Sequence, residues 1–190
     1  MAVRHSSPLC APVGLLLLLL GVFSSHLSEV QARPTDFWCN YQERKKMEQR
    51  TLEELKRDIA DCGGSDTLPS PVQLPGVRFR VAEWANKTLQ QRHAEVLGAL
   101  QVLQDGVRVA TNQTTSKCQS SLLQKLEHRI ANHLLIVNQI QPQNNTVTPS
   151  ESTVQNSTSQ TRKVLDQYEK LLKGKLERLA IDHKDSICKV

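Results

Sequence analysis

Four cysteines constrain the fold of this chain more than any other feature of its sequence. Cys39, Cys62, Cys118 and Cys188 remain once Cys10 is assigned to a leader segment. An even number of cysteines in a secreted chain indicates disulfide bonds, and four cysteines can pair in three ways. The helices predicted between them decide which pairing the chain can form.

The leader segment is an apolar run over residues 13–23, which follows a basic residue near the amino terminus. Its length of about 11 residues suits a signal peptide and is too short to span a bilayer. Residues 30–32 offer small side chains for cleavage, so we predict a signal peptide over residues 1–32, with a cut near Ser25 as the alternative. We therefore expect a secreted, extracellular chain in which residues 33–190 form one domain.

Four helices are predicted, because good helix formers fill most of the chain and apolar residues recur with the period of a helix face. The helices cover approximately residues 36–61, 82–110, 120–139 and 161–183. Their expected inward stripes are Trp38, Tyr41, Leu52, Leu55 and Ile59; Leu89, His93, Val96, Leu100, Leu103, Val107 and Ala110; Leu123, Leu126, Ile130, Leu134 and Val137; and Leu165, Tyr168, Leu172 and Leu179.

The first helix has an irregular stripe, because Lys45 and Glu48 interrupt its apolar residues. Thr35 or Asp36 can cap its beginning, and Gly63-Gly64 ends it.

Two of the three connections between these helices are long. Residues 63–78 contain three prolines, and residues 77–81 alternate as a short strand would. Residues 141–160 are rich in Ser, Thr and Asn and are expected to form a glycosylated loop. Four sequons predict N-glycosylation, at Asn86, Asn112, Asn144 and Asn156.

The disulfide pairing follows from the length of the first helix. About 23 residues separate Cys39 from Cys62, or roughly 34 Å of helix, whereas a disulfide needs Cα atoms within about 7 Å. An up-down-up-down bundle would place Cys118 and Cys188 beside Cys39 and leave Cys62 without a partner. An up-up-down-down bundle with two long crossover loops brings each cysteine to a partner. We predict this all-α four-helix topology, with disulfides Cys39–Cys188 and Cys62–Cys118.

The composition narrows the functional classes. The net charge of +5 suits an acidic receptor surface or heparin-like glycans. Secretion and the scarcity of aromatic residues argue against nucleic acid as a partner. No enzyme, cofactor or metal is expected, because the sequence lacks His-Glu-x-x-His, Gly-x-Ser-x-Gly and phosphate-loop motifs and its paired cysteines leave no nucleophilic thiol.

Several segments carry a family resemblance: Leu68-Pro-Ser-Pro-Val-Gln-Leu-Pro-Gly-Val-Arg-Phe79 followed by Glu83-Trp84, Leu97-Gly-Ala, Asp105-Gly-Val, Cys118-Gln-Ser-Ser-Leu-Leu123 and Leu171-Leu-Lys-Gly-Lys-Leu176. Together they resemble the erythropoietin/thrombopoietin family of four-helix cytokines, and its thrombopoietin branch in particular. The resemblance covers nearly all of residues 33–190. It departs from the family pattern at Asn40, Gln42 and Glu177, where that pattern has Asp, Arg and a basic residue.

The resemblance implies a haematopoietic cytokine that acts as a monomer and brings together two chains of the thrombopoietin receptor. This single-pass receptor signals through Janus kinases and STAT factors to promote the proliferation and maturation of megakaryocyte or thrombocyte precursors. An erythropoietin-like cytokine acting on erythroid precursors is the alternative, and a non-signalling secreted glycoprotein that binds glycans is a third possibility.

The two receptor chains are expected to bind two different faces. The resemblance assigns receptor contact to five residues of the first face, which Arg178 joins: Pro75, Phe79, Glu83, Lys173 and Lys175. The second face is expected to combine Lys45 and Lys46 with the helix surface near Gln124 and Glu127. Gly174 costs about 1 kcal/mol in a helix relative to alanine, which a close approach of receptor backbone would explain. Trp38 and Trp84 are expected in the core.

Overall fold

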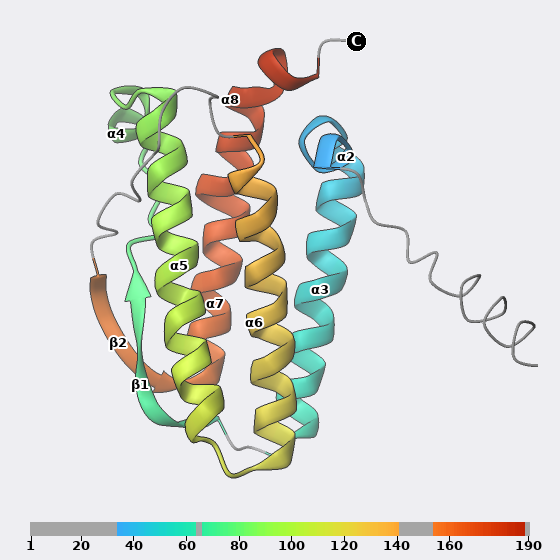
Figure 1. Cartoon of the computed structure of the whole chain (residues 1–190), viewed down its shortest axis with the longest axis vertical. Helices are drawn as coiled ribbons and strands as arrows, with labels where there is room; N and C mark the ends of the chain where they lie inside the picture. The colour runs from blue at the N-terminus through green and yellow to red at the C-terminus, as the bar shows by residue number, and fades with distance from the viewer. Residues whose placement is uncertain (1–33, 64–65, 141–153, 189–190) are drawn as a thin grey trace, which may run out of the picture. The chain divides into compact units, whose positions relative to one another are not determined.

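The computed structural model describes residues 34–63, 66–140 and 154–188 of the 190-residue chain (Figure 1). The predicted signal peptide and the sequon at Asn144 lie outside the described residues. Most of the described chain is helical, as the composition predicts. The helical elements are α2 (Pro34–Cys39), α3 (Tyr41–Asp61), α4 (Val81–Ala85), α5 (Leu89–Gln113), α6 (Lys117–Asn138), α7 (Thr161–Leu171), the π-helical turn η1 (Leu172–Leu176) and α8 (Glu177–Ile187).

The first predicted helix is broken near its beginning. Asn40 has an extended backbone, and its side-chain Oδ1 accepts a hydrogen bond of 3.1 Å from the Glu43 amide, so Asn40 is the N-cap of α3. A continuous helix capped by Thr35 or Asp36 is therefore wrong. The expected end of this helix is confirmed, because Gly63 follows α3 with a φ of 64°, a value that favours glycine.

The second predicted helix is also divided. Thr88 caps α5 through a reciprocal pair of hydrogen bonds: its hydroxyl accepts from the Gln91 amide, and the Gln91 side chain accepts from the Thr88 amide. This capping box begins a new helix at Leu89 and separates it from α4. Leu89 consequently lies at the rim and is 36% exposed, which contradicts its predicted inward position.

A two-stranded antiparallel sheet corrects the all-α prediction. Strand β1 (Thr67–Pro75) pairs with β2 (Val154–Gln160), so a strand lies in each long connection. The strand predicted over residues 77–81 is absent from the described structure. The register of β1 shifts between Thr67 and Val72 and again before Pro75. Proline lacks the amide hydrogen that a regular ladder requires, so the prolines of β1 are compatible with pairing only where the ladder is irregular.

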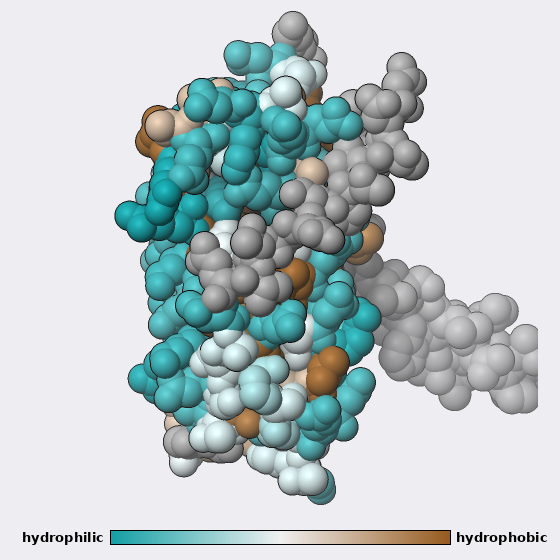
Figure 2. Space-filling model, turned by 90° about the vertical axis from the view of Figure 1, so that its left-hand side faces the viewer, coloured by the Kyte–Doolittle hydropathy of each residue, from teal (hydrophilic) through white to brown (hydrophobic). Residues whose placement is uncertain are grey.

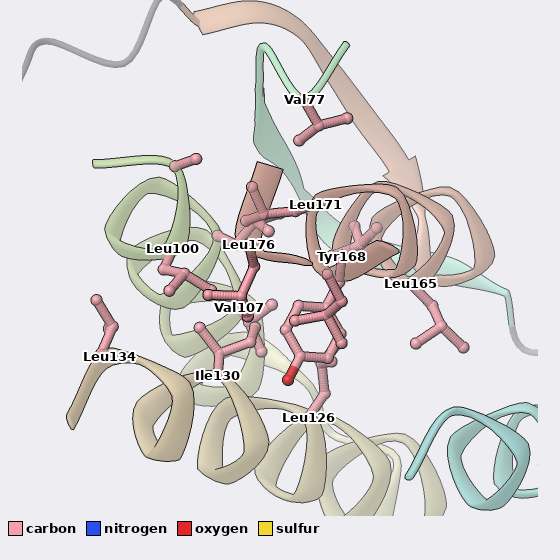
Figure 3. Close-up of a cluster of buried hydrophobic side chains, with 14 of the residues drawn as sticks. Val77, Leu100, Val107, Leu126, Ile130, Leu134, Leu165, Tyr168, Leu171 and Leu176 are labelled. Carbon is pink, nitrogen blue, oxygen red and sulfur yellow. The ribbon is translucent and has the colours of Figure 1, made fainter. Parts of the chain in front are cut away.

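The core lies between the four long helical segments, with β1 against α5. Figure 3 shows its centre, where α5, α6, α7 and η1 contribute large apolar side chains that include Leu100, Val107, Leu126, Ile130, Tyr168, Leu171 and Leu176. The inward stripes predicted for the last three helices are buried, apart from Leu89. In the first stripe Tyr41 is 46% exposed, which contradicts its predicted inward position. Of the two polar residues that interrupt this stripe, Glu48 is buried.

Two disulfides join the ends of the helices. Cys39 bonds Cys188 and Cys62 bonds Cys118, with Cα–Cα distances of 5.5 and 5.7 Å, and these are the pairs that the helix-length argument predicts. The Cys62–Cys118 bond holds the end of α3 beside the beginning of α6. The Thr161 amide donates to the carbonyl of Asp66 (2.8 Å), which places the beginning of α7 near the same end, as Figure 1 also shows.

Candidate functional site

The first predicted face comes from the segment after β1 and from the last helical segment. Of its six predicted residues, Glu83, Lys173 and Arg178 are exposed, Phe79 is half-buried, and Pro75 and Lys175 are buried. Each exposed charge of this set has a partner: Glu83 pairs with Arg80 (2.6 Å), Lys173 with Glu169 (2.6 Å) and Arg178 with Asp182 (3.3 Å).

Lys175 is buried and bonds to other parts of the chain, so it is not a surface charge. The residue is only 5% exposed, and its Nζ forms an ion pair of 2.7 Å with Glu95 of α5 and donates to the carbonyl of Gly76. Burial alone would raise the pKa of Glu95, but hydrogen bonds from Lys175 and Lys87 outweigh it and lower that pKa. Lys175 therefore fixes the segment after β1 against two helices, and its ammonium is not presented at the surface for a receptor.

Gly174 lies beneath the segment that follows β1. A Cβ on Gly174 would lie 3.6 Å from the Cβ of Phe79 and 4.0 Å from the carbonyl oxygen of Val77. Both distances are ordinary van der Waals contacts, so the described chain itself leaves room for a Cβ at Gly174, and the close approach of receptor backbone stays a prediction. The Phe79 ring packs edge-on against Trp84 with centroids 5.5 Å apart, and the indole of Trp84 donates to Asp182 (2.8 Å).

An open groove lies between this segment and α7. We call it the loop groove, and its lining is Val77, Arg78, Phe79, Asp166, Gln167, Glu169, Lys170, Lys173 and Gly174. It combines an aromatic edge with three cations and two carboxylates. Such a mixed surface suits a protein partner, because aromatic anchors and complementary charges are the usual centre and rim of an interface.

The second predicted face is only partly assembled. Lys45 and Lys46 are exposed on α3, where they line a shallow groove with Gln42, Gln49, Arg50 and Glu53. Gln124 is exposed on α6, but Glu127 pairs with Arg108 of α5 (2.9 Å) and so does not face α3.

The cations of α6 that reach α3 were missed by sequence reasoning. Lys125 pairs with Asp58 (2.8 Å) and Arg129 pairs with Glu54 (3.2 Å). The sequence period distinguishes the inward stripe from its flanks. It does not show which flank of α6 lies beside α3, so it cannot distinguish Glu127 from Lys125 or Arg129 as a neighbour of α3.

Two charged residues inside the bundle were also missed. Arg44 is 3% exposed, and its guanidinium holds both carboxylate oxygens of Glu177 (2.9 and 3.0 Å) while donating to the carbonyl of Phe37 (2.7 Å). Glu48, one turn further along α3, is 6% exposed. Burial and the nearby Glu177 charge raise the pKa of Glu48 to about 7, against the lowering effects of Arg44 and Lys173.

Glu48 lines a second groove, between α3 and the last helical segment. We call it the α3–α7 groove, and its lining is Tyr41, Lys45, Glu48, Gln49, Leu52, Glu53, Lys56, Glu169, Lys173 and Glu177. Glu169 accepts from both Lys56 (2.7 Å) and Lys173 (2.6 Å), and these hydrogen bonds lower its pKa despite the opposing effect of burial. Lys45 and Lys173 therefore belong to one continuous surface that crosses from α3 to η1.

Three sequons can be located. Asn86 is exposed at the end of α4, Asn112 in the last turn of α5 and Asn156 on β2. Figure 2 shows that the face bearing the sheet is mainly hydrophilic, with small separate hydrophobic spots. Glycans at these positions would not need to displace core side chains.

A comparison with known families decides the class of the chain. The model described as erythropoietin/thrombopoietin matches residues 45–189, which is more than half of the sequence. The chain belongs to the erythropoietin/thrombopoietin family. Members of this family are cytokines and not enzymes. Among the described residues, no helix of this family member is both long enough and apolar enough to cross a membrane.

Curated relatives place this family member near thrombopoietin. Mouse (Mus musculus) thrombopoietin is 36% identical over 88 residues, which are 43% of this chain and 25% of the relative. The rat (Rattus norvegicus) and dog (Canis lupus familiaris) thrombopoietins are each 28% identical over 151 residues. Those matches cover 73% of this chain, but 44% and 40% of the relatives, so the chain spans less than half the length of the curated relatives it matches.

Proposed function

We propose that this chain is a secreted thrombopoietin-like cytokine that brings together two chains of the thrombopoietin receptor and so activates JAK-STAT signalling in megakaryocyte or thrombocyte precursors. The observation that carries the proposal is the likeness to rat and dog thrombopoietin over 73% of the chain. The proposed bundle topology is up-up-down-down. The two end-to-end disulfides and the shared end of α3, α6 and α7 support it.

The first receptor chain would bind the loop groove. Phe79 offers an aromatic anchor at its edge, while Lys173 and Arg178 offer exposed cations that pair with the less exposed carboxylates of Glu169 and Asp182. Because both cations reach the surface, a receptor carboxylate can compete for them. Lys175 and Pro75 would act indirectly, by holding the segment that carries Phe79.

The second receptor chain would bind α3 and the adjoining side of α6. Lys45 and Lys46 have no ion-pair partner within the described part of the chain, and Lys45 lies 5.6 Å from the ring centroid of Tyr41. The residues proposed for the two faces differ, although Lys45 and Lys173 line the same α3–α7 groove. A monomer without two-fold symmetry could therefore hold two identical receptor chains.

Cells that express either the thrombopoietin or the erythropoietin receptor test this function. The purified chain should induce STAT phosphorylation through the thrombopoietin receptor. A Lys45→Glu, Lys46→Glu variant should still bind through the loop groove but fail to signal, and it should compete with the wild-type chain. The matched control is Lys117→Glu, Lys163→Glu, which carries the same charge change on exposed residues that line neither groove.

A response through the erythropoietin receptor alone would replace the proposal by the erythropoietin-like alternative. Salt-sensitive binding to heparin with no response through either receptor would favour a glycan-binding glycoprotein.

A further inference from the structure

We propose that Glu48 anchors a cationic side chain of the bound receptor, an arginine or a lysine that enters the α3–α7 groove and pairs with the Glu48 carboxylate. This inference deepens the proposed function and rests on it, because the cation belongs to the receptor.

The geometry of Glu48 is unusual for a carboxyl group. It is 6% exposed, it contributes to the lining of the groove, and its Oε1 atom is fully buried without a hydrogen-bond partner among the described residues. A buried polar group without a partner costs about 1–3 kcal/mol, more if it is charged. Oε1 itself is closed to the groove, but a cation that pairs with the part of the Glu48 carboxyl group lining the groove would stabilise its ionised form, so the site favours a cation or another strong donor.

The cations of the chain around Glu48 are committed elsewhere. On α3 itself, Arg44 holds Glu177 of α8, and Lys45 lies over the ring of Tyr41. Lys56 and Lys173 both bond Glu169 of α7.

The remaining neighbours do not supply a cation either. Tyr168 of α7 lies 2.7 Å from the His133 ring of α6, and Arg129 of α6 pairs with Glu54. The carboxylate of Glu177 adds a second negative charge beside Glu48. Apart from Lys45, which lies over the ring of Tyr41, the cations around Glu48 are already ion-paired, so this position complements a cation supplied from outside.

Binding of a cation at Glu48 would be linked to a proton. With a pKa of about 7, the Glu48 carboxyl of the free chain is roughly half protonated at neutral pH. Pairing with a guanidinium or ammonium favours the ionised form, so the receptor complex would release about half a proton at pH 7. Through this residue alone, affinity would rise about tenfold between pH 6 and pH 8.

Isothermal titration calorimetry with the extracellular region of the thrombopoietin receptor tests the proposal. Titrations at pH 7 in two buffers of different ionisation enthalpy give the protons released on binding. The wild-type chain should release about half a proton more than Glu48→Gln, and Glu48→Gln should bind more weakly at pH 8 and lose the pH dependence. Glutamine is nearly isosteric with the protonated carboxyl, so circular dichroism and thermal unfolding should report an intact bundle.

Asp105→Asn is the matched control, because Asp105 is an exposed carboxylate of α5 that pairs with Arg108 and lines none of the grooves described above. It should leave proton release and affinity unchanged. Equal proton release and equal affinity for wild type and Glu48→Gln would overturn this proposal alone. Absence of any binding by the wild-type chain would overturn the proposed function and this proposal with it.

Discussion

Buried charges set the positions of the residues on the two candidate faces. Arg44, Glu48 and Lys175 are all less than a tenth exposed. The position of Lys175 was predictable in principle, because it lies three residues after Leu172 and four before Leu179 on the inward stripe. Its neighbours Lys173 and Arg178 made it resemble a surface charge. For Glu48 the interruption of the first stripe was the signal, although periodicity alone could not tell a buried acid from a solvated one.

Lys175→Glu should destabilise the fold, because it places a second carboxylate beside Glu95 and removes the donor to Gly76. Breaking a buried pair in this way costs about 3–5 kcal/mol. Urea unfolding measures the loss. Lys173→Glu, which breaks the pair of an exposed lysine with Glu169, is the control and should cost less than Lys175→Glu. Equal losses for the two variants would refute the internal role of Lys175.

The dependence of stability on pH should contain two opposing contributions. Burial lowers the pKa of His133 to about 4, from 6.5, so the unfolded chain binds more protons and stability falls as the pH drops from about 6.5 to 4. Glu48 has a raised pKa of about 7, against 4.5 when unfolded, so the folded chain binds more protons and stability rises as the pH drops from about 7 to 4.5.

Glu48→Gln removes the second contribution. Relative to the wild type, this variant should therefore gain about 3 kcal/mol more in its free energy of unfolding at pH 8 than at pH 4. Urea unfolding at the two pH values measures the difference. The same relative stability at both would contradict the burial argument for Glu48.

At the scale of helices and strands, the sequence predicted the inward stripes better than the boundaries. The stripes of α5, α6 and the last segment follow directly from a 3.6-residue period. The breaks at Asn40 and Thr88 depend on side-chain caps, which compete with helix continuation through local hydrogen bonds that periodicity does not register. Strand β1 was missed because its prolines argue against a strand, and its pairing with β2 spans a long sequence separation.

Strand β1 approaches α5 closely at Gly106. A Cβ at Gly106 would lie 2.6 Å from Cγ1 of Val72, so Gly106→Ala should force β1 away from α5 and destabilise the fold by about 1–3 kcal/mol. Thermal unfolding measures this effect. At Gly174 the nearest atom would be 3.6 Å away, so Gly174→Ala should be neutral or stabilising. A stable Gly106→Ala variant would contradict the close approach.

At the scale of the whole molecule, the disulfides were predictable because the length of the first helix and the lengths of the connections both favour the same pairing. Chain entropy predicts that loss of Cys62–Cys118, which closes 56 residues, costs about 4 kcal/mol. Loss of Cys39–Cys188, which closes 149, should cost about 5 kcal/mol. Urea unfolding of the two double Cys→Ala variants measures these losses, and a much larger loss for the shorter loop would contradict the entropic account.

The two receptor faces stay predictions, and the structure bears only on which of their residues lie together. Their positions follow from the family resemblance, whereas their members depend on which flank of α6 lies beside α3 and on which lysine of η1 turns inward. In the described structure Lys125 and Arg129, and not Glu127, form ion pairs with α3. Lys175 is buried.

The stoichiometry of the complex with the receptor's extracellular region tests the two-face account most directly. Light scattering coupled to size-exclusion chromatography should give one ligand with two receptor chains for the wild type. The same measurement should give one ligand with one receptor chain for Lys45→Glu, Lys46→Glu. A complex of one to one for the wild type, or of one to two for that variant, would contradict it.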